Sequence, residues 1–108
     1  MNKNELRKLL LCRDGAKCHY CRIECGEEHF IKIWGVFYKT RGFRLEIEHK
    51  DNDKKENTTE NCVLACPICN SAKSNKFSYE EFKRVGDVIR EIWQQKARKL
   101  GIKYEATP

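Results

Sequence analysis

The spacing of the cysteines constrains the fold of this chain more than any other feature. Two Cys-x-x-Cys pairs, Cys18/Cys21 and Cys66/Cys69, stand at the two ends of the segment 22–65. Each pair can place two thiolates at about 2.3 Å from one ion, and two such turns complete a tetrahedral zinc site. Simple zinc ribbons have roughly 15–20 residues between their pairs. We therefore expect these four cysteines to bind one structural zinc that joins the ends of a larger unit.

The other three cysteines point to a reducing compartment. Cys25 is close enough to the first pair to compete with Cys21 as a ligand, whereas Cys12 and Cys62 are expected to be small core residues. An odd total of seven cysteines is unusual in a secreted disulfide framework. The N-terminal MNKNELRKLLLC lacks the apolar centre of a signal peptide, and no apolar run reaches transmembrane length. We expect a cytoplasmic, or at least intracellular, protein without a membrane partner.

Composition indicates a thin core and a polyanionic partner. A chain of 108 residues suits one domain, and we predict a single domain over 1–108. Charged residues make up 35% and hydrophobic ones only 40%, so a stabilising metal is expected. The net charge of +6 favours nucleic acid over a membrane surface, because no amphipathic anchor is present. A generally basic, solvated surface is the alternative interpretation.

The hydrophobic pattern predicts helices at both ends and two short strands between them. The segments 43–49 and 61–66 read as strands, and Pro67 offers a helix start. The best-defined element is a helix over 78–100, because Ser78 and Glu81 have capping-box spacing. An N-terminal helix over 4–12 is expected to bury Leu6, Leu9 and Leu10. The apolar stripe of the C-terminal helix comprises Phe82, Val85, Ile89, Ile92 and Trp93.

A carboxylate directly before a histidine, Glu48-His49, follows the first strand. Hydrolysis of a phosphodiester needs a base for the attacking water and a cation for the charge on the leaving oxygen. Mg²⁺ takes oxygen ligands and keeps several waters, so Glu48 and the amide oxygen of Asn70 can suffice. Histidine ordinarily titrates near neutral pH, which makes His49 the natural base. Asn70 directly follows Cys69, so a zinc there would fix its direction.

Taken in order, these residues resemble the HNH (His-Asn-His, ββα-metal) endonuclease family, in its four-cysteine, zinc-containing subgroup. The residues are Glu48, His49, Asn61, Cys66, Cys69, Asn70 and Lys73. The resemblance covers about 18–73, within a core motif of 18–75, and is strongest over 47–73. It implies a small α+β fold, a ββα-metal centre with a structural zinc and flanking helices.

The resemblance also implies a function and a role for each residue. The chain would be a metal-dependent DNA endonuclease that leaves 5′-phosphate and 3′-hydroxyl ends. Glu48 and Asn70 would hold Mg²⁺ or Mn²⁺, and His49 would activate water. Asn61 would brace the loop that carries His49, and Lys73 would face the site and meet a phosphate. With one site per chain, a monomer would nick DNA and a homodimer would make paired cuts; a bacterial or phage origin fits such an enzyme.

Two departures from the family pattern stand out. Many members have Asp where this chain has Glu48, and the insert 26–44 has no family role. In that insert Lys39, Arg41 and Arg44 are candidate phosphate contacts. Its aromatic residues are expected in the core rather than as a base-stacking platform; they are Trp34, Phe37, Tyr38 and Phe43.

Two other classes of function are compatible with the sequence. One is a non-catalytic, zinc-stapled DNA-binding module, and the other is a zinc-dependent protein-interaction knuckle. Single residues also have ordinary interpretations: Asn70 as a helix N-cap, Lys73 as a solvated lysine and His19 as an exposed residue between two ligands.

Overall fold

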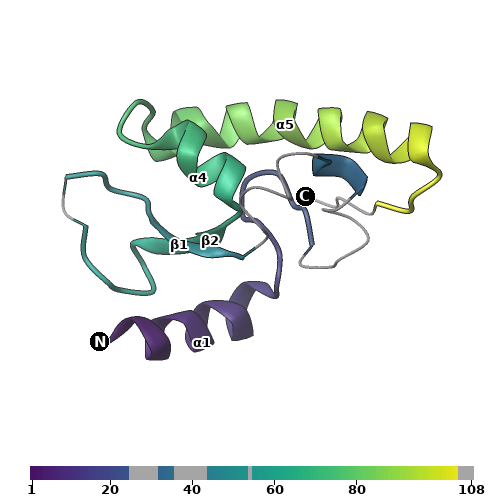
Figure 1. The fold of residues 1–108 in the computed structure, drawn as a ribbon. Coiled ribbons are helices and arrows are strands. Elements are labelled where there is room, and N and C mark those ends of the chain that lie inside the picture. The colour runs from purple at the N-terminus through teal and green to yellow at the C-terminus, as the bar shows by residue number, and fades with distance from the viewer. Residues whose placement is uncertain (25–31, 36–43, 54, 105–108) are drawn as a thin grey trace.

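The computed structural model describes residues 1–24, 32–35, 44–53 and 55–104. The helices and strands with bounds in these ranges are α1 Lys3–Asp14, β1 Glu46–His49, β2 Cys62–Ala65, α4 Pro67–Lys73 and α5 Tyr79–Leu100. The two-stranded sheet lies in the middle, α1 on one side of it and α5 on the other, with α4 between the sheet and α5 (Figure 1). The mixture of helices with a small sheet is the α+β class expected from the sequence.

The sheet is short and antiparallel, and it leads directly into α4. Glu48 pairs with Val63, and His49 pairs with Cys62. Every residue of β2 is buried. α4 begins at Pro67, as the sequence predicts, because a proline tolerates the first helical position, where no N–H partner is needed. Both strands and α4 lie within the segment 18–73 that the family resemblance covers.

The first helix packs against β2 through a narrower stripe than the sequence suggested. Asn2 caps it by accepting a hydrogen bond from the Glu5 amide at 2.8 Å. Leu6 and Leu10 are fully buried, but Leu9 is 46% exposed, so the prediction that it is buried is wrong. The contact between α1 and β2 is narrow, so the single row formed by Leu6 and Leu10 is enough to fill it.

The C-terminal helix, α5, has the predicted caps, but it does not bury every residue of the predicted apolar stripe. Ser78 and Glu81 form both hydrogen bonds of a capping box, and Gly101 ends the helix with a left-handed backbone. Phe82 and Trp93 are buried, whereas Ile92 is 42% exposed, contrary to the prediction. The buried face turns instead toward the small residues Gly86 and Ala97.

Gly86 is where α5 meets the first cysteine turn, Cys18–Cys21. A Cβ at this position would lie 2.7 Å from the Cβ of Tyr20 and 2.8 Å from its carbonyl oxygen. Only glycine permits this approach, since no real Cβ contact is so short. The Tyr20 ring also meets Phe82 edge-on, with centroids 4.9 Å apart. α5 therefore holds the first cysteine turn in place by direct backbone packing.

The insert is described only in part. Trp34 is buried and lies near Trp93, with ring centroids 6.5 Å apart, which confirms its predicted core role. Phe37, Tyr38 and Phe43 lie outside the described residues. Within the described ranges, no helix has the length and apolarity required to cross a bilayer.

Gly86→Ala tests the close packing of α5. In an exposed helix this change is stabilising, because alanine has the higher helix propensity. Here the added methyl would overlap Tyr20, so we expect a loss of about 1–3 kcal/mol in the free energy of unfolding. Val88→Ala, at an exposed position of the same helix, should change it little. Denaturant unfolding of the zinc-loaded protein measures both; a Gly86→Ala variant as stable as the native chain would contradict the packing.

Candidate metal centre and active-site cleft

Four buried cysteines gather at one point of the structure. The sulfur atoms of Cys18, Cys21, Cys66 and Cys69 all lie within 4.8 Å of one another. The sulfurs of Cys21 and Cys66 are 3.7 Å apart. A tetrahedral zinc with four bonds of about 2.3 Å places its sulfurs about 3.8 Å apart. Donor type, number and spacing therefore fit one zinc ion, as the sequence predicts.

Local hydrogen bonds shape the two cysteine turns. In the first cysteine turn the Arg22 amide donates to the Cys18 carbonyl, and Arg22 has a left-handed backbone with φ 66°. The His19 amide donates to the Leu64 carbonyl of β2 at 2.8 Å. In the second cysteine turn, Cys66–Cys69, the sulfur of Cys66 caps α4 by accepting from the Cys69 amide. Each turn is thus attached to the sheet or to α4.

Without a cation the four thiols cannot all ionise. Burial opposes ionisation of Cys18, but hydrogen bonds from the other three thiols outweigh it and hold its pKa well below the ordinary value. Burial and the Cys18 side chain raise the pKa of Cys66. Hydrogen bonds with the neighbouring thiols raise the pKa of Cys69. One thiolate is therefore favoured at the expense of the rest, and a divalent cation is the natural partner for all four.

The other cysteines differ in their surroundings. Cys62 is buried in β2, with its thiol 3.3 Å from the Glu56 carbonyl oxygen, which confirms its predicted core role. Cys12 is exposed on α1, so the prediction that it is a core residue is wrong. Cys25, the possible competing ligand, lies outside the described residues.

Glu48 is buried, and both of its carboxylate oxygens are engaged. The Lys73 ammonium lies 2.7 Å from Oε1, and the Tyr20 hydroxyl donates to Oε2 at 2.5 Å. Lys73 is fully buried, and its remaining donors reach the Asn52 side chain at 2.9 Å and the His49 carbonyl at 3.4 Å. An ammonium has three donors, so every one is used. The pair is a fully hydrogen-bonded buried ion pair.

His49 and Asn70 share a cleft with Glu48. This cleft, called here the Glu48 cleft, has a volume of about 220 Å³ and is lined by Ile47, Glu48, His49, Asn52, Lys55, Asn70, Ser74 and Asn75. The Nε2 atom of His49 lies 2.8 Å from Oδ1 of Asn57. Asn70 donates from its amide nitrogen to Glu46 at 2.8 Å, which leaves its amide oxygen as the atom suited to a cation. The structure therefore brings together the three residues on which the sequence-based mechanism depends.

Asn61 makes the hydrogen bonds that a brace for the His49 loop requires. Its side-chain oxygen accepts from the Asp51 amide at 3.0 Å, and its backbone carbonyl accepts from the Lys50 amide at 2.6 Å. Its side-chain nitrogen donates to the Glu56 carbonyl. The two ends of the loop after β1 are thus tied together at Asn61.

The structure describes only two of the four candidate phosphate contacts, Arg44 and Lys73. Lys39 and Arg41 lie outside the described residues, and Arg44 is exposed. Lys73 does face the site, but its buried ammonium offers no exposed donor to a phosphate in this structure. The ion pair with Glu48 takes the place of the expected contact.

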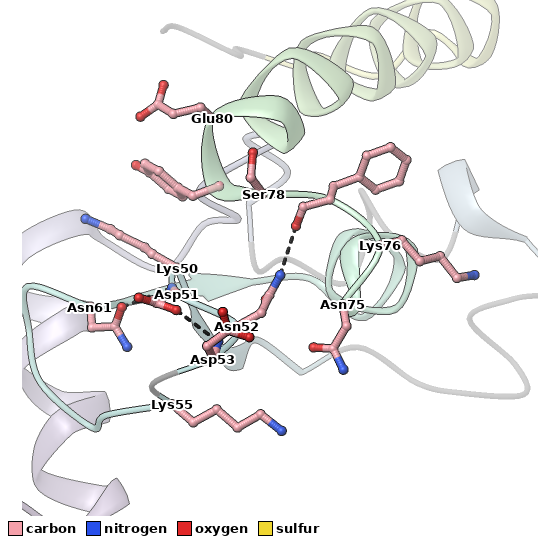
Figure 2. Close-up of a pocket in the computed structure, with 12 residues that line it drawn as sticks. Lys50, Asp51, Asn52, Asp53, Lys55, Asn61, Asn75, Lys76, Ser78 and Glu80 are labelled. Atoms are coloured by element: carbon pink, nitrogen blue, oxygen red, sulfur yellow. Dashed lines mark hydrogen bonds between the residues drawn. The ribbon is translucent and has the colours of Figure 1, made fainter.

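A broader cleft adjoins the Glu48 cleft and shares Asn52, Lys55 and Asn75 with it. It measures about 950 Å³ and lies between the loop after β1 and the start of α5. Figure 2 shows its lining, with Lys50 and Asp51 on the loop side and Ser78 and Glu80 on the α5 side. Asn52 spans the two sides by donating to the Phe77 carbonyl at 3.0 Å (Figure 2).

Sequence reasoning missed several residues of the site. Tyr20 was assigned no role, although its hydroxyl contacts Glu48. His19, expected to be exposed, is half-buried, with its ring nitrogen 2.8 Å from the Tyr79 hydroxyl. Glu46, two residues before Glu48, is on the same face of β1, and this period of two was the available signal. Nothing in the sequence marked Asn57 as the partner of His49.

One comparison with known proteins bears on this site. An alignment of 73 residues, 66% of this chain, is 33% identical to a protein of Bacillus subtilis (strain 168) named "SPbeta prophage-derived putative HNH endonuclease YoqL". The alignment covers 29% of that protein, so this chain spans less than a third of its length. No family model and no solved structure matches the chain. The relative's name agrees with the family that the residue order resembles.

Loss of one thiol should release the ion and much of the folded structure. We expect the native chain to bind one zinc and Cys66→Ser to bind it far more weakly, because a structural zinc supplies folding free energy directly. Zinc content by mass spectrometry and thermal unfolding by circular dichroism measure the two effects. Cys12→Ser is the matched control, since Cys12 is exposed and outside the cluster. Equal thermal stability with and without zinc would contradict a structural role.

Proposed function

We propose that this chain is a metal-dependent DNA endonuclease of the HNH type, which hydrolyses phosphodiester bonds. The observation that carries the proposal is the shared cleft: Glu48, His49 and Asn70 line one small hollow beside α4. The cysteine cluster, proposed to hold structural zinc, lies at the start of the same helix. The name of the Bacillus subtilis relative supports the same class of activity.

In this proposal the two oxygen-bearing side chains hold the catalytic ion. Glu48 would contribute a carboxylate oxygen, and Asn70 its amide oxygen. The ion, Mg²⁺ or Mn²⁺, supplies positive charge for the scissile phosphate and the leaving oxygen. Because Oε1 of Glu48 is paired with Lys73, a cation that binds there must share or displace that ammonium.

His49 would accept the proton of the attacking water. An amide oxygen only accepts hydrogen bonds, so the contact with Asn57 places the proton of the imidazole on Nε2. In this proposal the other ring nitrogen, Nδ1, is the atom that takes the proton of the water. Asn61 would act indirectly, by holding the loop that begins after His49.

The DNA strand would continue from the Glu48 cleft into the broad cleft and past Tyr79. Tyr79 lines both the broad cleft and a third hollow that contains Arg22 and Lys83. The ammonium groups of Lys50 and Lys83 lie 5.0 and 4.8 Å from the centre of the Tyr79 ring. Two like charges beside one ring attract a phosphate, which offsets their mutual repulsion. These lysines are the proposed flanking phosphate contacts.

A second candidate function is a non-catalytic, zinc-stapled DNA-binding module. It is favoured by the state of Glu48, whose two oxygens are already satisfied by Lys73 and Tyr20. Such a module would use the same clefts and lysines without cutting DNA. Cleavage and binding must therefore be measured separately.

Cleavage of supercoiled plasmid tests the catalytic proposal. We expect Mg²⁺-dependent nicking that His49→Ala reduces by about a hundredfold or more, because the loss of a general base costs roughly 10²–10⁴ in rate. Glu48→Asp should retain cleavage and Glu48→Ala should lose it, whereas Glu60→Ala, at an exposed carboxylate of the neighbouring loop, should behave as native. Equal nicking by the native and His49→Ala chains would contradict this mechanism, and binding without nicking would favour the module.

The salt dependence of binding tests the flanking contacts. Removing Lys50 and Lys83 together, by Lys50→Gln and Lys83→Gln, should lower the slope of log affinity against log salt by about one per lysine. The measurement is fluorescence anisotropy of a short duplex in the His49→Ala background, without added Mg²⁺. Lys8→Gln on α1, on the other side of the sheet, is the control (Figure 1). An unchanged slope in the double variant would remove these contacts.

A further inference from the structure

Tyr20 links the first cysteine turn to the carboxylate of Glu48. It stands between Cys18 and Cys21 in sequence, is only 2% exposed, and donates its hydroxyl proton to Oε2 of Glu48. The bond joins residues 28 positions apart. Tyr20 therefore belongs to the first cysteine turn and also contacts the proposed catalytic site.

The position of Tyr20 is fixed from several sides. Its backbone lies against Gly86, and its ring packs edge-on against Phe82 at an interplanar angle of 88°. Cys18 and Cys21, the flanking ligands, are fully buried. A side chain held in this way cannot follow Glu48 if the glutamate changes conformation. Tyr20 is thus a fixed point to which Glu48 is attached.

The two partners of Glu48 differ in charge. The hydroxyl of Tyr20 is an uncharged group that donates a hydrogen bond to Oε2. Lys73, by contrast, is a cation on Oε1. A divalent cation repels the ammonium of Lys73 but not the hydroxyl of Tyr20. Exchange is therefore expected at Oε1, while Oε2 stays bonded.

We propose that Tyr20 is a positioning residue that anchors Glu48 to the first cysteine turn and leaves Oε1 as the oxygen that binds the divalent cation. The inference rests on the proposed function, because it takes Glu48 as a ligand. It adds a link from the structural metal cluster to the catalytic carboxylate that is independent of Asn70. In metal enzymes, loss of such a supporting hydrogen bond typically weakens metal binding about 10–100-fold.

Binding of Mn²⁺ to the zinc-loaded chain tests the anchor without reference to cleavage. Free Mn²⁺, measured by electron paramagnetic resonance, should show about 10–100-fold weaker binding in Tyr20→Phe, with zinc content unchanged. Excess Mn²⁺ should then restore cleavage, because the defect lies in ion binding. Tyr104→Phe is the matched control: its hydroxyl donates to the Cys21 carbonyl at 2.6 Å, on the same turn but away from Glu48. It should bind Mn²⁺ as the native chain does.

A double-mutant cycle shows whether Tyr20 acts through Glu48. In a Glu48→Ala background, Tyr20→Phe should weaken Mn²⁺ binding no further. Equal Mn²⁺ affinity in the native and Tyr20→Phe chains would overturn the inference, as would an undiminished effect in the Glu48→Ala background. If the effect is present but the native chain cuts no DNA, the anchor stands and the endonuclease proposal fails.

A second measurement keeps the inference testable if Tyr20→Phe does not fold. With 3-fluorotyrosine in place of Tyr20, the ¹⁹F resonance should shift on addition of Mg²⁺, because its hydrogen-bond partner then binds the ion. The same label in place of Tyr104 should not shift. The inference would be overturned if the chemical shift at position 20 did not change at Mg²⁺ concentrations that support cleavage.

Discussion

The approach of four thiols within 4.8 Å of one another is the constraint on which the rest of the structure depends. It joins the first cysteine turn to the start of α4, two segments that enclose both strands. The chain is too rich in charge to hold these segments by hydrophobic burial alone. Four thiols in this arrangement could bind one zinc ion. We therefore expect folding and metal binding to be coupled in this protein.

The ion pair between Glu48 and Lys73 is the second constraint. Burying two charges is costly, and it is tolerated here because each has its hydrogen bonds satisfied. The arrangement places the Glu48 carboxylate at the edge of the core, where it lines a cleft that opens to solvent. The ion pair therefore holds the proposed ligand of the catalytic cation in position.

Local patterns predicted the elements better than they predicted the contacts. The caps of α5, the proline start of α4 and the two strands follow from rules that act over a few residues. Helical periodicity placed Ile92 and Leu9 in the core, but they are 42% and 46% exposed. Their exposure reflects how little partner surface a chain of this size supplies. Hydrophobic periodicity predicts which face of a helix is buried. The width of that buried face depends on the element that packs against it.

From residue type and spacing alone, the sequence predicted which four cysteines lie together, the order of the elements, and the grouping of Glu48, His49 and Asn70. Tertiary structure alone decided that Lys73 is buried against Glu48 rather than exposed to DNA. It alone placed the Tyr20 hydroxyl on the same carboxylate, and Asn57 on His49. These contacts join residues whose separation in sequence carries no periodic signal. The position of Tyr20 itself depends on the close approach of α5 through Gly86 to the first cysteine turn, which no local pattern predicts.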